Sequence, residues 1–372
     1  MNEEGQMRLP REIVGERSEP SPAHADAGTD DPNEALAEEL TTSDGFVLTS
    51  RLFSPRTLLS FLFALALIVF VFRSLNIDIG QTLYHMRNAN PFWLLTAFGV
   101  FYLTFPLRAI RWRILLINAD VPIAAGRTSW ASLPALMEYI YLSWFVNCIV
   151  PAKLGDAYRG YLLKHNGQVS FSATFGTIFA ERLLDMLALF VLLVLSGWLT
   201  FGAHLPESTQ IVFAFGGLLV LAIIAGLASM RWLSPLIHRI LPQRVHRVYG
   251  NFEHAALRSF RPAVLPQLIG LTAMVWLLEG FRLYFVILAL AQEGLILSVP
   301  AIIFVALASS LLTALPITPA GLGVVESTVT GVLILFGVDR NLGSAVTLLD
   351  RLINFWSLIV FGFLLYLVSK RK

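Results

Sequence analysis

The sequence contains little charge for its length and almost no cysteine. Only 14% of its 372 residues are Asp, Glu, Lys or Arg, whereas 56% are hydrophobic. A water-soluble protein of this size needs more polar surface, so this balance excludes a soluble fold and favours a protein that folds in a bilayer. The single cysteine, Cys148, excludes an internal disulfide and is expected to be a small buried apolar residue.

Motifs of enzyme catalysis are missing as well. The chain has no Gly-rich phosphate loop, no nucleophile elbow and no HExxH motif. All seven histidines lie outside the apolar stretches, so no metal cage is expected inside the membrane. We therefore expect no catalytic residues, no metal, no cofactor, no enzyme activity and no binding of nucleic acid.

Charge is distributed unevenly along the chain. Residues 1–50 hold 12 acidic and 3 basic residues, and they are rich in Pro and Ala. Such a segment buries too little apolar surface to offset its chain entropy, which predicts a disordered acidic N-terminal tail. Residues 51–372 are then predicted to form one polytopic membrane domain.

Five or six apolar stretches qualify as transmembrane helices, for which a span of about twenty residues is needed. They are residues 58–72, 92–107, 171–199, 211–230, 264–291 and 345–368. Two further stretches are interrupted by proline and glycine, at 151–155 and at 316–323, which end a helix. Irregular backbone at membrane depth requires burial in protein or a wet cavity, so both are predicted to be re-entrant hairpins. The expected fold is all-α, with about six full crossings and two hairpins, or eight to nine hydrophobic segments.

Basic residues predict the orientation. Residues 231–261 contain six arginines and one acid, whereas residues 202–210 and 292–299 contain no Lys or Arg. By the positive-inside rule the first segment is cytoplasmic and the other two are external. Both termini are then cytoplasmic, the hairpins enter from opposite sides, and the protein is expected in the cell's inner (plasma) membrane.

The two halves of the membrane domain share motifs in the same order. Residues 151–155 match 319–323, and residues 181–185 match 350–354. Pro151 precedes Arg182 by 31 residues, and Pro319 precedes Arg351 by 32. Three crossings and one hairpin per half, over about 55–200 and 211–368, predict an inverted repeat, an arrangement typical of alternating-access transporters.

Charges inside the apolar stretches are costly and are expected to face the bundle interior. Glu181 and Asp185 share one helix face, and Glu279 and Arg282 can pair within one helix. Two interpretations remain open for these groups. They are local ion pairs that join helices, or they line a polar cavity where Arg182 and Arg351 bind an anionic group and Glu181 and Asp350 hold these arginines when the cavity is empty.

The first hairpin motif combines Asn147, Pro151, Gly155, Asp156 and Arg159. Gly155 is expected to permit a tight turn, and Asp156 either caps the next helix or acts in function. Arg159 is expected near the cytoplasmic interface, where its side chain can reach the headgroups.

The second break, with Pro319, Gly321 and Gly323, is followed by Glu326, which either neutralises an arginine or carries a proton. The candidate substrate-binding residues are Arg111, Asn147, Pro151, Gly155, Asp156, Arg159, Glu181, Arg182, Asp185, Glu279, Arg282, Pro319, Gly321, Gly323, Glu326, Asp350 and Arg351.

Together these motifs resemble the transmembrane region of lysylphosphatidylglycerol synthases and their stand-alone, flippase-like relatives. The similarity covers roughly residues 55–368, and Lys153 departs slightly from the pattern. The resemblance implies a lipid-handling membrane domain. The soluble domain that makes the aminoacylated lipid in the synthases has no counterpart in this sequence, so a flippase or transporter is expected rather than a synthase.

The expected function is movement of an anionic lipid, of phospholipid or polyprenyl type, between leaflets. Two alternatives remain. One is a membrane transferase acting on a lipid carrier, with Glu181 and Asp185 as acid and base. The other is a non-catalytic scaffold, with a lipid- or glycan-synthesis enzyme as its partner. Membrane lipid is the expected partner in each case.

Overall fold

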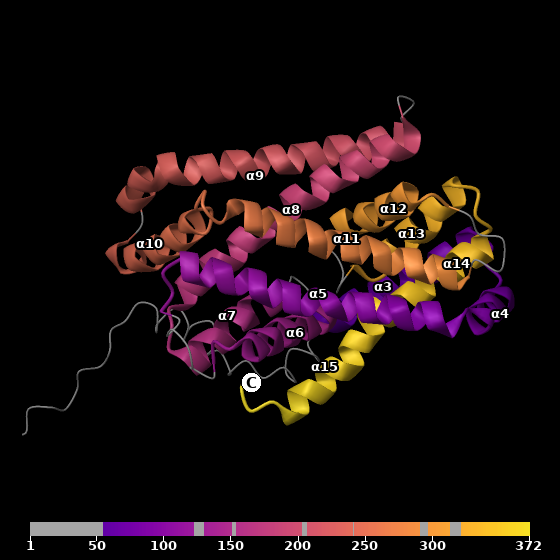
Figure 1. The fold of residues 1–372 in the computed structure, drawn as a ribbon, viewed down its shortest axis with the longest axis horizontal. Coiled ribbons are helices and arrows are strands. Elements are labelled where there is room, and N and C mark those ends of the chain that lie inside the picture. The colour runs from indigo at the N-terminus through magenta and orange to yellow at the C-terminus, as the bar shows by residue number, and fades with distance from the viewer. Residues whose placement is uncertain are drawn as a thin grey trace, which may run out of the picture.

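The computed structural model describes residues 55–122, 130–150, 154–202, 207–240, 242–290, 297–312 and 321–372. All secondary structure within these ranges is helical, as the all-α prediction requires (Figure 1). The predicted acidic tail and the residues Pro151 and Pro319 lie outside the described ranges.

Helices occupy each of the six predicted crossings. They are α3 (Pro55–Ser74), α5 (Pro91–Asn118), α8 (Phe171–Phe201), α9 (Glu207–Ile240), α11 (Leu265–Ala289), and α14 (Arg340–Arg351) followed without a gap by the π-helix η3 (Leu352–Trp356) and α15 (Ser357–Val368). Three of the described helical stretches, namely α5, α11 and the continuous run 340–368, are long and apolar enough to cross a membrane. The predicted stretch 92–107 was too short, because α5 continues to Asn118.

Two pairs of short helices occupy the predicted hairpins. α6 (Leu133–Ile149) is followed by α7 (Leu154–Gly167), and α12 (Val299–Leu312) is followed by α13 (Val324–Leu335). None of the four is long enough to cross a bilayer alone. Helices α6 and α7 pack against each other, and α12 packs between α8, α11 and α13.

Two amphipathic helices lie outside the apolar stretches. α10 (Gln243–Arg258) lies within the basic segment 231–261, and the ring of its Phe252 packs against Phe175 and Phe179 of α8. α4 (Ile79–Asn88) was not predicted. It begins at the N-cap Asp78 and is joined to α14, where Asn341 accepts a hydrogen bond from the Asp78 N–H and donates one to Gln81.

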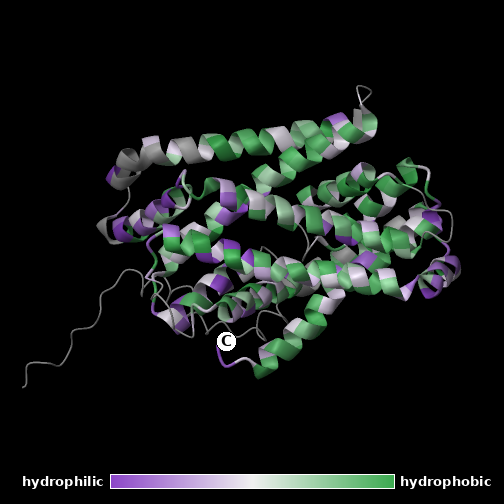
Figure 2. Cartoon of the chain, viewed as in Figure 1, coloured by the Kyte–Doolittle hydropathy of each residue, from purple (hydrophilic) through white to green (hydrophobic). Residues whose placement is uncertain are grey.

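Polar residues gather at the two ends of the bundle, with apolar helix between them (Figure 2). We name the end that carries α10 the basic end. There Arg258 and Arg261 pair with Asp120 after α5, and Glu138 of α6 pairs with Arg371. α4 and the start of α14 lie at the opposite end, where the N–H of Asn90 donates to the carbonyl of Ala289 over 2.8 Å.

The two hairpins have their outer ends at different ends of the bundle. At the basic end, Asn166 near the end of α7 donates to the carbonyl of Arg371. At the opposite end, Phe336 after α13 stacks on Phe201 at the end of α8.

Candidate functional site

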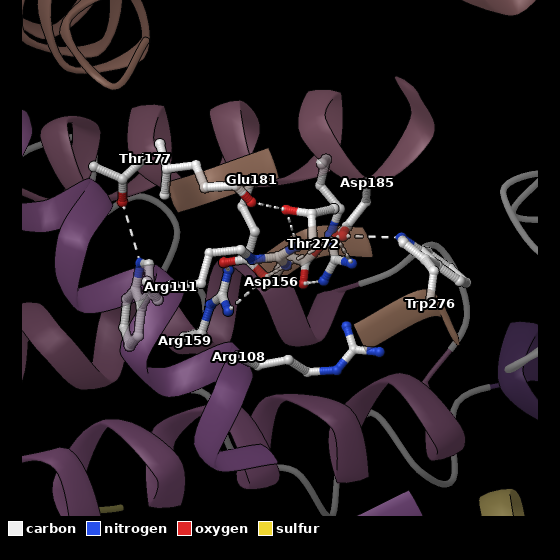
Figure 3. Close-up of polar contacts among 12 residues, drawn as sticks. Arg108, Arg111, Asp156, Arg159, Thr177, Glu181, Asp185, Thr272 and Trp276 are labelled. Carbon is white, nitrogen blue, oxygen red and sulfur yellow. Dashed lines mark hydrogen bonds and ion pairs between the residues drawn. The ribbon is translucent and has the colours of Figure 1, made fainter. Parts of the chain in front are cut away.

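Arg111 on α5 is the centre of a buried ion-pair cluster in the first half of the domain (Figure 3). Its guanidinium donates to Asp185 over 2.6 Å and to Glu181 over 3.0 Å, both on α8. Thr272 of α11 accepts a third hydrogen bond at 2.9 Å. The predicted shared face of Glu181 and Asp185 is confirmed, since both carboxylates meet the same guanidinium.

Arg159 on α7 lies inside this cluster and not at the interface as predicted. It is fully buried, pairs with Glu181 at 3.0 Å, and stacks on Trp112 with its guanidinium carbon 4.5 Å from the ring centroid. The carboxylate and the indole face together offset the cost of removing the guanidinium from water.

Arg182 pairs with Asp156 at the start of α7, not with its neighbour Glu181. Two of its nitrogens donate to the Asp156 carboxylate over 2.9 and 2.7 Å. Adjacent residues of a helix point about 100° apart, so Glu181 faces Arg111 and Arg159 while Arg182 faces Asp156. Asp156 lies within the first turn of α7 and not at its N-cap, so the predicted capping role is not realised.

A second set of pairs joins α11, α13 and α14. Arg282 donates to Asp350 over 2.7 and 3.1 Å and, as predicted, also pairs with Glu279 within its own helix. Arg351 pairs with Glu326 at 2.7 Å. The prediction that Asp350 holds Arg351 was therefore wrong. Of the two roles considered for Glu326, neutralising an arginine is confirmed.

The glycines of the two breaks have different structural roles. A Cβ on Gly155 would lie 2.0 Å from the Ser143 carbonyl oxygen, and the Gly155 N–H donates to Asn147 over 2.9 Å. Gly155 therefore permits close packing of α7 on α6, and not the predicted turn. Gly321 and Gly323 have φ of 70° and 82°, a conformation that side chains disfavour.

Sequence reasoning missed several residues of the cluster. Arg108 is one turn before Arg111, pairs with Glu279 at 3.0 Å and lies 4.4 Å from the ring of Trp144. Its spacing from Arg111 was the available signal. Trp276 donates to Asp185 over 3.3 Å. No sequence signal distinguished it, because the chain has eight tryptophans.

The charges of the cluster balance. Each of its six arginines has at least one carboxylate partner, and the cluster contains six carboxylates. The members are Arg108, Arg111, Arg159, Arg182, Arg282 and Arg351 with Asp156, Glu181, Asp185, Glu279, Glu326 and Asp350. Such pairing is required of charges in an apolar bundle.

Matched sequence positions make the same kind of contact in both halves. Arg111 pairs with Glu181 at 3.0 Å, and Arg282 pairs with Asp350 at 2.7 Å. Each half also has a pair between a hairpin carboxylate and a helix arginine, which we name the hairpin pairs. They are Asp156–Arg182 and Glu326–Arg351, each at 2.7 Å.

Comparison with known families identifies the wider group. The family described as "lysylphosphatidylglycerol synthase TM region" matches residues 57–362, a range that contains the whole ion-pair cluster. The chain belongs to this family.

Curated relatives are membrane proteins of archaea. A UPF0104 membrane protein of Methanocaldococcus jannaschii is 37% identical over 228 residues, which cover 61% of this chain and 95% of the relative. One from Pyrococcus horikoshii is 23% identical, over 79% of this chain and 92% of the relative. Glycosyltransferase AglD of Haloferax volcanii is 26% identical over 34% of this chain and 19% of its own length. Membership in the lysylphosphatidylglycerol synthase TM family and the apolar helices together make this a multi-pass membrane protein.

Proposed function

We propose that this protein moves an anionic lipid, of phospholipid or polyprenyl type, from one leaflet of the membrane to the other. The observation that carries the proposal is the charge-balanced cluster of arginines and carboxylates buried where both hairpins meet the long helices. Guanidinium groups bind phosphate oxygens in a bidentate geometry. Ion pairs of this number are weak stabilisers compared with apolar packing, which favours a role beyond joining helices.

We further propose that the halves form an inverted repeat with both termini cytoplasmic. Support comes from the outer ends of the hairpins, which contact different ends of the bundle. Exposed Arg239, Arg247, Lys370 and Lys372 lie on the side of the basic end, and the positive-inside rule makes that end cytoplasmic. The plasma membrane is the proposed location.

In this proposal, Arg182 and Arg351 contact the headgroup, and Asp156 and Glu326 are their partners when the site is empty. The cluster also contains hydrogen-bond donors without a partner among the described residues. Within the described residues, the Nε–H groups of the buried Arg111 and Arg159 have no hydrogen-bond partner. Headgroup oxygens or water would satisfy them, because an unsatisfied buried donor costs free energy.

A transferase acting on a lipid carrier is the second candidate. The similarity to glycosyltransferase AglD favours it, although only part of each chain is covered. Both carboxylates proposed as acid and base, Glu181 and Asp185, are already neutralised by arginine, which disfavours proton transfer by them. We therefore propose that the protein is not an enzyme. A scaffold role, with a synthesis enzyme as partner, predicts no lipid movement by the protein alone.

Leaflet exchange in proteoliposomes tests the proposal. The purified full chain should accelerate dithionite quenching of inner-leaflet fluorescent phosphatidylglycerol or polyprenyl phosphate. Arg182→Gln with Asp156→Asn should fold, because no buried charge is left unpaired, yet lose exchange at least tenfold. Arg258→Gln at the exposed surface is the matched control and should retain it. Exchange by the double variant at the wild-type rate would show that the pair only joins helices. Mass spectrometry of co-purified lipid then names the substrate class.

A further inference from the structure

The two hairpin pairs differ in exposure. The Arg182 side chain is 29% exposed and that of Asp156 12%, whereas Arg351 and Glu326 are each 7% exposed. Every other carboxylate in the cluster has a side chain at most 9% exposed. One hairpin pair is therefore accessible in this conformation, and its counterpart in the other half is closed.

Charge balance restricts what this accessible pair can bind. An anionic headgroup that joins a neutral cluster adds one uncompensated negative charge to a site surrounded by apolar helices. Such a charge is expensive at membrane depth unless it is paired or neutralised. Loss of the negative charge of one carboxylate by protonation removes the imbalance.

Asp156 is the carboxylate best placed to be neutralised. Glu181 is shared by two arginines, and Asp185 accepts from Arg111 over 2.6 and 3.2 Å and from Trp276. Among the described residues, the hydrogen bonds that Asp156 accepts come from Arg182. The charged groups around Asp156 in that part of the chain are Arg182 and Glu181 of α8 and Arg159 of α7. On α6, the Asn147 amide oxygen is taken by the Gly155 N–H.

We propose that Arg182 is the entry site for a phosphodiester headgroup and that a proton binds with it; this inference rests on the proposed function. The phosphate oxygens replace the Asp156 carboxylate on the Arg182 guanidinium, and the released carboxylate forms an O–H bond with a proton taken from water that reaches the pair. The cluster gains one negative and one positive charge and stays neutral. Glu326–Arg351 performs the same exchange when the other side is open.

Titration calorimetry of the detergent-purified full chain with dihexanoylphosphatidylglycerol tests this step. Runs in two buffers of different ionisation enthalpy measure the protons bound per ligand. Wild type should take up about one proton, and its Kd should rise about tenfold per pH unit where free Asp156 is ionised. Asp156→Asn should bind at least as tightly at neutral pH, with no proton uptake and no such pH dependence. Asp120→Asn, which removes an exposed carboxylate outside the cluster, is the matched control and should retain the uptake.

Three results would overturn the inference: no proton uptake by wild type, uptake that persists in Asp156→Asn, or no binding of the phosphodiester. If Glu326→Gln loses proton uptake while Asp156→Asn retains it, the proton binds at Glu326 and not at Asp156. That outcome also contradicts the inference. Sodium phosphate is titrated in parallel, and equal affinity for it would assign the site to a free anion instead of a lipid. If the protein exchanges lipid between leaflets but takes up no proton, the proposed function stands and this inference fails. If it binds the phosphodiester with a proton but exchanges no lipid, only the proposed function fails.

Discussion

Arg111 and Arg282 occupy matched positions in the two halves of the chain, and the carboxylates at their matched partner positions, Glu181 and Asp350, differ in how many arginines they hold. In the first half, Glu181 holds two fully buried arginines, Arg111 and Arg159. In the second half, Asp350 holds only Arg282, and Arg282 has Glu279 as another partner. In the first half, the motif therefore gives one carboxylate that pairs with two arginines. In the second half, it gives one arginine that pairs with two carboxylates.

This difference shows how matched motifs diverge. Arg159 has no charged counterpart in the second half, because Ser327 occupies the matching position after Gly323. The extra cation in the first half is balanced by Asp185, where the second half has Asn354. The first half then contributes four arginines and three carboxylates to the cluster, and the second half contributes two arginines and three carboxylates. The charges balance across both halves through the Arg108–Glu279 pair, as the low dielectric of a membrane interior requires.

Removal of Glu181 should have the largest effect on stability. Glu181→Gln leaves Arg159 without its carboxylate and Arg111 with one, so we expect a loss of about 3–5 kcal/mol. Asp350→Asn should cost less, about 1–3 kcal/mol, because Arg282 keeps Glu279. Thermal unfolding in detergent measures both variants. Equal losses would contradict the two-cation dependence on Glu181.

Substitution of the hairpin glycines should have the next largest effect and separate their roles. The Cβ of Gly155→Ala would overlap a backbone oxygen, so we expect a loss of about 3 kcal/mol or more. Gly323→Ala should cost about 1–3 kcal/mol because its φ is positive. Gly331→Ala, where a Cβ meets no atom within 4 Å, is the control and should not destabilise. A larger fall in the unfolding midpoint for Gly323→Ala than for Gly155→Ala would refute this assignment.

The hairpin pairs should differ in their contribution to stability. Arg351→Gln leaves Glu326 unpaired in a closed site and should cost about 2–3 kcal/mol. Arg182→Gln should cost about 1 kcal/mol less, because the side chain of Asp156 is 12% exposed and that of Glu326 7%. The same unfolding assay checks this order, and the reverse order would show that the exposure difference has no energetic meaning.

The smallest effect is expected at the basic end. Asp120→Asn removes pairs with Arg258 and Arg261 whose side chains are 44–47% exposed. Its cost should stay below about 1 kcal/mol and vanish in high salt, because exposed charges are screened. The cost of Glu181→Gln should be insensitive to salt. A salt-insensitive loss in Asp120→Asn would place Asp120 in a desolvated site.

The sequence alone indicated that the protein folds in a lipid bilayer, that it is helical, and which family it resembles. Apolar stretches of bilayer length require helices in lipid, and prolines and glycines mark where those helices break. The same sequence identified nearly every arginine and carboxylate of the cluster, because a charge in an apolar stretch stands out from its neighbours. It also marked the basic segment 231–261, which contains α10.

Only the tertiary structure decided which charges pair. Neighbours in the sequence, such as Glu181 and Arg182, point to different faces of their helix and find partners on other helices, 22 to 70 residues away. Those partners depend on how α5, α7, α8 and α11 are packed, which no local pattern encodes. The position of Arg159 was wrong for the same reason. A guanidinium beside a carboxylate and an indole is stable where an isolated one is not, and those two groups come from α8 and α5.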